Sequence, residues 1–354
     1  MTRAAVVCGL GGAVPATAIS NSALAAQLDT TDTWIRTRTG IRRRYVIAPG
    51  EATSDLAVAA GRRALNSARR TAADPQVEHR TTDADLVVLA TSTPDRPCPA
   101  TAPAVAHRLG LSGAAAFDVG AVCTGFLYAL ATAASMITAG AAHRALVIGA
   151  DTFSTILDPA DRTTRAIFGD GAGAVVLRAG TTDEPGALLG FDLGSDGSGE
   201  ELITVRAGGS RQRSTATPPP VGDEFFAMEG RSVFTKAVLN MSTSAHTLLD
   251  RIGWARPDLD RLVAHQANLR ILRAVGEQLG LTDDQLVVNL DRVGNTVAAS
   301  VPLALADAAL DGTLRPGDRV LLTGFGGGLT WGSAALRWPD ALQVEAVPGM
   351  ADAL

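Results

Sequence analysis

A long run without charged side chains constrains the fold of this chain more than any other segment. The stretch from residue 117 to 142 begins as a β-like segment, reaches Cys123 and continues as a helix of small and apolar residues. Because no charge occurs between Asp118 and His143, we expect this helix to be buried on all sides. At a helix N-terminus, unpaired N–H groups and the helix dipole favour a thiolate, so Cys123 is a candidate nucleophile.

Two other interpretations of this segment are open. Cysteine is among the most buried residue types, so Cys123 could simply be a core residue. The run is also long enough to cross a bilayer. Its residues are mostly Ala, Gly, Ser and Thr, however, with few large apolar side chains to drive insertion, which argues against a membrane helix.

The composition is typical of a globular enzyme. Hydrophobic residues make up 46% of the 354 residues, enough to form the core of one large domain or two. The net charge of −5 argues against nucleic-acid binding as the main role. Cys8, Cys98 and Cys123 form neither a disulfide framework nor a metal site, and the N-terminus predicts a strand and not a signal peptide. We therefore expect a cytoplasmic protein.

Hydrophobic periodicity and turn residues predict alternating strands and helices. Strands are expected at residues 4–9, 86–90, 145–149, 174–177, 262–265, 287–290 and 319–323, the first one closing at Gly11 and Gly12. Besides the helix after Cys123, helices are expected at residues 21–28 (capped by Asn21 or Ser22), 53–68, 102–109 and 232–252, with one ending at 279 and one opening near 296. Residues 69–82, 151–165 and 207–222 are expected to be loops, and the tail after Arg337 to be loosely held.

A faint internal repeat divides the chain into two halves. Cys123 precedes an alanine-rich helix and then H-R-A-L-V-I-G, whereas Asn295 precedes another such helix and then G-D-R-V-L-L-T-G. Two similar halves with buried helices predict a layered α/β/α/β/α fold. The expected boundaries are 1–180 for the first half, 181–227 for an irregular connecting segment with strands, 228–338 for the second half and 339–354 for the tail.

Symmetric packing of these halves would bring three polar residues together at their centre. Cys123, His265 and Asn295 each lie at the junction of a strand and a helix, flanked by small residues. A cysteine nucleophile, a histidine and an amide donor form a coherent set for acyl transfer. The set therefore favours a catalytic Cys123 over a core cysteine.

A tryptophan among arginines forms a second candidate site. Trp34 lies in T-D-T-W-I-R-T-R-T-G-I-R-R-R, which ends in Arg42, Arg43 and Arg44. This segment could be a solvated charged loop. It could also bind a ligand in which Trp34 stacks on a planar ring and arginines meet phosphates.

Six blocks of sequence resemble the β-ketoacyl-acyl-carrier-protein synthase III family. They are W-I-R-T-R-T-G-I-R-R-R, F-D-V-G-A-V-C-T-G-F, F-G-D-G-A-G-A, V-A-H-Q-A-N-L-R-I-L, G-N-T-V-A-A-S-V-P-L-A-L and G-F-G-G-G-L-T-W-G-S-A-A-L, in the family's order. These enzymes initiate fatty-acid and some polyketide synthesis and belong to the thiolase superfamily. The resemblance implies a five-layered thiolase-like fold built from two similar halves, and a homodimer.

The resemblance also implies a role for particular residues. Cys123 would be acylated by an acyl-CoA, and His265 and Asn295 would then stabilise the enolate formed when a malonyl-carrier protein loses carbon dioxide. The backbone N–H groups of Cys123 and Gly327 would form an oxyanion hole. At the entrance, Trp34 and Arg162 would sandwich adenine, Arg38 and Asn268 would line the pantetheine path, and Arg270 would hold the carrier protein or cofactor. Beyond these two thioester substrates, the cycle needs no metal or redox cofactor.

One position departs from part of the family. Cys98 aligns with a residue that lines the acyl pocket across the dimer, where some acetyl-preferring members have a bulky aromatic side chain. A small residue leaves room for longer or branched acyl starters. Alternatively, Cys98 is a passive small residue.

Three related functions compete with the decarboxylating condensation. A non-decarboxylating acyltransferase that uses a hydroxyl or amine acceptor would be expected to alter His265 or Asn295, and both are present. A non-catalytic dimer partner would be expected to lack Cys123. A biosynthetic thiolase would be expected to have a second cysteine near the C-terminal glycines, where G-F-G-G-G-L has none.

Overall fold

Runs of small and β-branched residues form two mixed sheets in this computed structural model, which describes residues 2–71, 84–215, 217–340 and 342–349. The first sheet has the order β1-β7-β6-β4-β5, and the second has the order β11-β12-β13-β8. The first contains β1 (Arg3–Ala13), β4 (Leu86–Ala90), β5 (Ala115–Val119), β6 (Arg144–Asp151) and β7 (Gly171–Thr181). The second contains β8 (Leu188–Ser195), β11 (Arg261–Ala264), β12 (Arg319–Gly326) and β13 (Thr330–Arg337).

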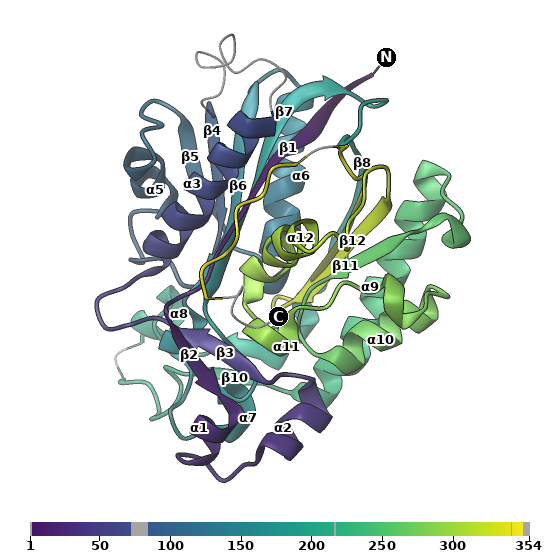
Figure 1. Cartoon of the computed structure of the whole chain (residues 1–354). Helices are drawn as coiled ribbons and strands as arrows, with labels where there is room; N and C mark the ends of the chain where they lie inside the picture. Colours follow the sequence, from purple (N-terminus) through teal and green to yellow (C-terminus); the bar gives the residue numbers. More distant parts are fainter. Residues whose placement is uncertain (1, 72–83, 216, 341, 350–354) are drawn as a thin grey trace.

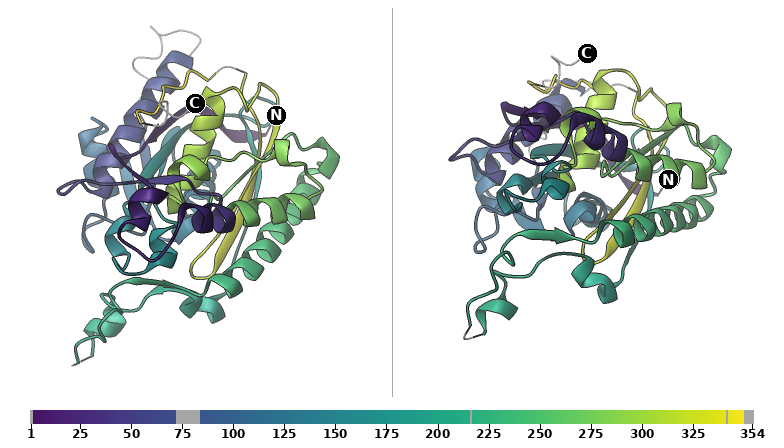
Figure 2. Two further views of the ribbon diagram at one scale, coloured as in Figure 1. Left: turned by 60° about the horizontal axis from the view of Figure 1, so that its bottom comes forward. Right: turned by 90° about the horizontal axis from the view of Figure 1, so that it is seen from below.

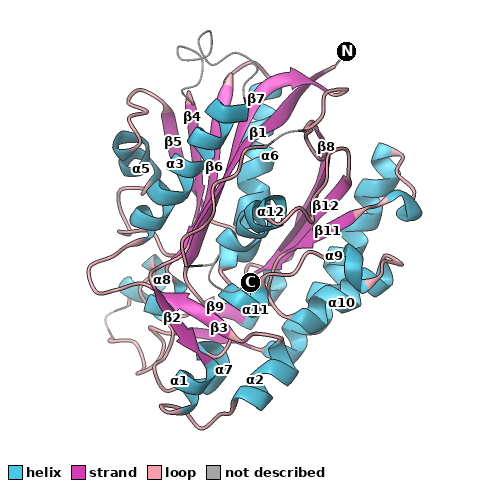
Figure 3. Ribbon diagram, in the orientation of Figure 1, coloured by secondary structure: helices cyan, strands magenta, loops and turns pink. Residues whose placement is uncertain are grey.

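Helices cover both sheets and fill the space between them (Figures 1 and 3). On the outer face of the first sheet lie α3 (Thr53–Thr71) and α5 (Ala102–Arg108). Between the sheets lie α6 (Gly125–Thr138) and α12 (Ser300–Leu310). On the outer face of the second sheet lies α9 (Gly230–Ile252), with α10 (Leu269–Gln278) beside it. The five-layered thiolase-like architecture predicted from the sequence is confirmed.

Smaller elements surround the end of the sheets that faces the viewer in the right panel of Figure 2. The short strands are β2 (Thr17–Ser20), β3 (Arg43–Val46), β9 (Ile203–Val205) and β10 (Phe226–Met228). The short helices are α1 (Asn21–Ala25), α2 (Asp32–Thr39), α7 (Arg162–Arg165), α8 (Ser210–Arg213) and α11 (Leu290–Val293). The 3₁₀ turns at this end are η1 (Val122–Thr124), η2 (Phe153–Ile156), η3 (Gly197–Leu202) and η6 (Val297–Ala299). Two others, η4 (Arg256–Asp258) and η5 (Asp283–Gln285), lie at the opposite end, beside the start of β11 and β12. Figure 2 shows the segment with α8 projecting from the body.

The internal repeat is visible in the strand order. Read from one edge, β1-β7-β6-β4 of the first sheet corresponds to β8-β13-β12-β11 of the second, with the same parallel and antiparallel pairs. The central helices α6 and α12 occupy equivalent places, and each follows a 3₁₀ turn. β8 lies within the segment expected to be a connector, so the second half takes a strand from before residue 228.

The first strand differs from its prediction because of close helix packing. β1 does not close at Gly11 and Gly12 but continues to Ala13. A Cβ added at Gly9 would lie 2.4 Å from the Ala64 carbonyl oxygen, and one at Gly11 would lie 2.4 Å from the Ala60 carbonyl oxygen. These glycines therefore let α3 approach the sheet, and they do not mark a turn.

Other differences concern the ends of elements. The cap of α1 is Ser20, whose hydroxyl accepts a hydrogen bond from the Ala23 N–H, so neither Asn21 nor Ser22 is the cap. Residues 287–290 form no strand: Leu286 makes one isolated bridge to Leu262, and α11 begins at Leu290. Short helices also occur within segments expected to be loops or irregular, namely α2, α7 and α8. Residues 69–71 belong to α3, and 72–82 of that predicted loop lie outside the described residues.

The tail is held more firmly than expected. Trp338 and Val347 are each only 3% exposed, and the Tyr45 hydroxyl donates a hydrogen bond of 2.5 Å to the Gly349 carbonyl oxygen. Arg70 of α3 forms an ion pair with Glu345. The prediction of a loosely held tail is therefore wrong for residues 338–340 and 342–349.

We predict that Gly9→Ala destabilises the fold. Its methyl group would overlap the α3 backbone, and overpacking of this kind costs about 1–3 kcal/mol. The free energy of unfolding, measured by urea titration, should fall by this amount. Gly197→Ala is the control, because a Cβ at Gly197 meets nothing within 4 Å. Equal stability of the two variants would contradict the packing argument.

Candidate active site

Cys123, His265 and Asn295 line one cavity at the centre of the molecule. The rest of its wall is mainly apolar and includes Phe153, Phe168, Phe226, Ile203, Met228 and Phe325. Three of these aromatic rings pack together, with centroids 4.7 to 5.1 Å apart. The sequence prediction that the three polar residues meet is confirmed. The cavity is shaped for an apolar group that reacts at its polar end.

Cys123 lies on η1, the 3₁₀ turn between β5 and α6. Val122 before it has φ of 47°, which a β-branched residue rarely adopts, so the turn is strained. On its other side lies Gly326, where an added Cβ would be 2.8 Å from the Cys123 backbone nitrogen. Any side chain at position 326 would therefore cover the Cys123 N–H group.

Burial and a nearby charge both oppose ionisation of the Cys123 thiol. Burial raises the pKa of this thiol, and the negative charge of Asp151 raises it further. The expectation that the helix N-terminus favours the thiolate is therefore wrong for the unliganded enzyme. The helix proper begins only at Gly125, and the loss of water around the sulfur outweighs the effect of the helix dipole.

His265 is a neutral hydrogen-bond donor. Burial lowers its pKa to about 3. Its Nδ1 lies 2.6 Å from the Ser300 hydroxyl oxygen, which also accepts a hydrogen bond of 3.4 Å from the Gln266 N–H. The Ser300 hydroxyl can donate its own proton to Nδ1 of the neutral ring. Nε2 then carries the ring proton and can donate it to a ligand.

Asn295 is oriented by its own turn. Its Oδ1 accepts a hydrogen bond of 2.9 Å from the Val297 N–H. The amide NH₂ group is therefore the end that can donate into the cavity. Val297 has φ of 53°, matching the strain at Val122 in the other half.

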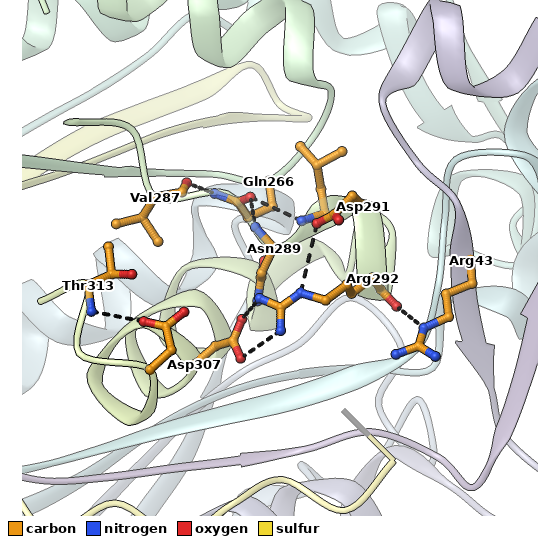
Figure 4. A network of polar contacts seen from close by, with 10 residues as sticks. Arg43, Gln266, Val287, Asn289, Asp291, Arg292, Asp307 and Thr313 are labelled. Atoms are coloured by element: carbon orange, nitrogen blue, oxygen red, sulfur yellow. Dashed lines mark hydrogen bonds and ion pairs between the residues drawn. The ribbon is translucent and has the colours of Figure 1, made fainter. Parts of the chain in front are cut away.

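Gln266 connects His265 to the segment that leads to Asn295 (Figure 4). Its fully buried amide donates to the carbonyl oxygens of Ala264 and Val287 at 2.9 and 3.0 Å. Its Oε1 accepts hydrogen bonds from the backbone N–H groups of Asn289 and Leu290 at 3.0 and 3.3 Å. The ion pair of Arg292 with Asp307 then joins α11 to α12. Gln266 and Ser300 were not among the residues predicted from the sequence. A polar residue within an apolar run is the pattern that could have indicated them.

A second cavity of about 1,330 Å³ forms the entrance. Trp34, Arg38, Asn268 and Arg270 line it, as predicted for the mouth of the site. Met228 lines both this cavity and the central one, so the two adjoin at that side chain. Arg231 also lines the entrance and was missed by sequence analysis.

Trp34 contacts two arginines in this structure. The Arg38 and Arg162 guanidinium carbons lie 5.3 and 5.7 Å from the Trp34 ring centroid. Arg162 donates hydrogen bonds to the Asp29 carbonyl oxygen at 2.6 Å and to its carboxylate at 3.2 Å. Direct contact leaves no space for a ring between Trp34 and Arg162, so a sandwich requires Arg162 to move outward.

The arginines that follow α2 have different roles. Arg44 is buried, and it donates to the Asn21 side chain at 2.8 Å and to the Ala166 carbonyl oxygen at 2.6 Å. Burial lowers its pKa to about 10. Arg43 donates to the Arg292 carbonyl oxygen at 3.2 Å. The sequence left two alternatives for Arg44, a solvated charged loop and a phosphate-binding site. Neither fits, because its buried guanidinium links other parts of the chain.

Two further predicted residues, Gly327 and Cys98, do not line the central cavity. Gly327 is buried, and an added Cβ would be 3.0 Å from Ile203, which lines the central cavity. Cys98 is exposed and does not line the central cavity of its own chain. Its predicted contact with a partner's acyl pocket stays a prediction.

The described part of the chain contains neither a candidate metal site nor a candidate membrane-spanning helix. No group of three or more His, Cys, Asp or Glu side chains there is arranged to hold a metal ion. No helix among those residues is long and apolar enough to cross a membrane.

Comparisons with known proteins agree with this geometry. The family model 3-oxoacyl-[acyl-carrier-protein (ACP)] synthase III matches residues 117–197, and the model of its C-terminal part matches residues 249–338. The relative β-ketoacyl-[acyl-carrier-protein] synthase III 5 of Streptomyces coelicolor is 58% identical over 340 residues, which cover 96% of this chain and 99% of the relative.

Solved structures give the same result. The crystal structure of 3-oxoacyl-(acyl carrier protein) synthase III from Pseudomonas aeruginosa has a TM-score of 0.87 and 54% identity, covering 96% of this chain and 100% of that one. The priming β-ketosynthase of the R1128 polyketide pathway has a TM-score of 0.85 and 35% identity, covering 95% and 96%. Fold and site are those of a thiolase-fold condensing enzyme. More narrowly, the chain belongs to the β-ketoacyl-[acyl-carrier-protein] synthase III family.

We predict that Gln266→Leu destabilises the site and the fold together. The substitution leaves two backbone N–H groups and two carbonyl oxygens without their partner, and each buried unsatisfied group costs about 1–3 kcal/mol. Urea titration should show a loss of several kcal/mol. Gln278→Leu makes the same change at an exposed position of α10 and should have little effect. A small loss in Gln266→Leu would mean that this amide does not hold the 287–290 segment.

Proposed function

We propose that this enzyme condenses an acyl-CoA with malonyl-acyl-carrier protein, releasing CoA and carbon dioxide and forming a 3-oxoacyl-carrier protein. Membership of the family supports this reaction. One observation carries the assignment of residues: fixed N–H donors on His265 and Asn295 share a buried cavity with the Cys123 thiol. Such a set suits a reaction in which negative charge develops on a thioester oxygen.

The first half-reaction is acylation of Cys123. Its sulfur attacks the acyl carbon, the bond to the CoA sulfur breaks, and the thiol proton leaves with CoA. The backbone N–H groups of Cys123 and Gly327 hold the oxyanion of the tetrahedral intermediate. The small volume of Gly326 supports this role, because it leaves the Cys123 N–H group uncovered.

The second half-reaction is decarboxylating condensation. The bond from the malonyl α-carbon to the carboxylate breaks, and its electron pair forms an enolate. Nε2–H of His265 and the amide NH₂ of Asn295 donate to the enolate oxygen, each contributing about 3–4 kcal/mol of stabilisation. The α-carbon then attacks the acyl group, the bond to the Cys123 sulfur breaks, and the thiolate takes up a proton.

The entrance cavity holds the carrier of each thioester. The Arg162 side chain moves outward, and the adenine of CoA binds between Trp34 and Arg162. Arg38 and Asn268 line the pantetheine path. Arg270 meets the acidic surface or phosphate of the incoming carrier. The cycle uses no metal or redox cofactor. We propose a homodimer, in which Cys98 of each chain borders the acyl pocket of the other.

A non-decarboxylating acyltransferase is the alternative reaction. It would use Cys123 in the same way but would not need two donors directed at an enolate. The relatives found are condensing enzymes, which does not favour this alternative. The likeness to a priming synthase of a polyketide pathway leaves both fatty-acid and polyketide synthesis open as its setting.

We predict that acylation and condensation can be separated by mutation. Intact mass after incubation with acyl-CoAs should show one adduct, absent in Cys123→Ala. His265→Ala and Asn295→Ala should form the adduct but lose about 10²–10³-fold in condensation with malonyl-carrier protein, because each lacks one enolate donor. An adduct that malonyl-carrier protein leaves untouched, but that a hydroxyl or amine acceptor discharges, would instead support the alternative.

We also predict that Cys98 helps select the starter. Cys98→Phe should slow acylation of Cys123 by isobutyryl- and octanoyl-CoA at least tenfold, because the ring fills the partner's pocket. Acylation by acetyl-CoA should keep its rate. Arg96→Phe adds the same ring at an exposed position of the same loop and is the control. Strong acetyl selectivity in the unmodified enzyme would contradict the prediction.

A further inference from the structure

Asp151, at the end of β6, is a buried carboxylate to which sequence analysis gave no role. It is 0% exposed. Oδ1 accepts hydrogen bonds from the Ser92 N–H at 2.7 Å and from the Thr93 and Thr91 hydroxyls at 3.1 and 3.3 Å. Oδ2 accepts a hydrogen bond of 3.0 Å from the Ala298 N–H in the other half of the molecule. One side chain thus joins the end of β4 to the turn η6.

The repeat shows what is unusual about this position. β6 and β12 are equivalent strands of eight residues, so Asp151, the last residue of β6, corresponds to Gly326, the last residue of β12. The turns η1 and η6 are also equivalent, and each begins with a valine at positive φ. Cys123 therefore corresponds to Ala298. The Ala298 N–H is bound by a carboxylate, whereas glycine leaves the Cys123 N–H uncovered.

We propose that Asp151 is a positioning residue: it holds the η6 turn that directs Asn295. This asymmetry would give two related turns different tasks. One turn presents an open N–H group beside the sulfur, and the other presents the Asn295 amide.

The effect follows from the strain in η6. Val297 has φ of 53°, which a β-branched residue rarely adopts. Two acceptors stabilise the turn, since Asn295 Oδ1 binds the Val297 N–H and Asp151 binds the Ala298 N–H. Loss of the second acceptor would let the turn relax and rotate the Asn295 amide away from the enolate.

Asp151→Ala removes the acceptor for the Ala298 N–H, and Asp151→Asn is the conservative variant, because its amide oxygen can still accept that hydrogen bond. Intact mass should show that both variants are still acylated on Cys123 by an acyl-CoA. Decarboxylation of malonyl-carrier protein should fall at least tenfold in Asp151→Ala, because Asn295 is misdirected, and Asp151→Asn should recover part of this loss. A purely structural residue would lower acylation and decarboxylation in parallel.

Asp170→Ala is the matched control. Asp170 is also fully buried and accepts hydrogen bonds from the Ile47 and Ser154 N–H groups and from the Ser154 hydroxyl. This variant should lose stability without separating decarboxylation from acylation. A parallel fall of both reactions in Asp151→Ala, or no fall in decarboxylation, would overturn the proposal.

Asp151→Asn also covers the case in which Asp151→Ala does not fold. Its ratio of decarboxylation to acylation should be lower than that of the unmodified enzyme, and an unchanged ratio would overturn the proposal. The decarboxylation readout rests on the proposed function. Failure of the unmodified enzyme to decarboxylate would count against the proposed function, whereas equal ratios in the variants and the unmodified enzyme would count against this proposal alone.

Discussion

The packing of two central helices between two sheets is the constraint on which the site depends. α6 and α12 fit there because their residues are small, and glycines in the strands let the turns before them approach closely. A Cβ at Gly149 would lie 2.2 Å from the Ala298 carbonyl oxygen, and one at Gly326 would lie 2.8 Å from the Cys123 nitrogen. The two turns are therefore pressed against strand ends, which explains why both can sustain a valine at positive φ.

Burial of the polar groups follows from the same packing and sets the direction of their pKa shifts. It disfavours the charged forms of both groups, because it raises the pKa of the Cys123 thiol and lowers that of the His265 imidazole. Neutral donors cost little to bury when their partners fix them, as Ser300 does for His265. Charge then develops only during reaction, where directed N–H groups are available to meet it.

The sequence was sufficient to predict the layers and the central polar set because both depend on local patterns. The uncharged run around Cys123 predicts a buried helix, and His265 and Asn295 follow at corresponding strand–helix junctions. Residues whose role depends on distant partners could not be predicted. Gly9 and Gly11 look like turn residues until α3 is placed against them. Arg44 looks like a phosphate ligand until Asn21 and Ala166 surround it, and the tail looks free until Tyr45 and Arg70 meet it.

The central claim is that the enzyme catalyses a decarboxylating condensation. The ratio of carbon dioxide released to acyl groups transferred from Cys123 tests it most directly. Enzyme acylated on Cys123 would be mixed, in a single turnover, with malonyl-carrier protein labelled with ¹³C in the free carboxylate. This account predicts one labelled carbon dioxide for each acyl group that leaves Cys123, with an unlabelled 3-oxoacyl-carrier protein as product. Loss of the acyl group without release of label would contradict it and assign the cavity to simple acyl transfer.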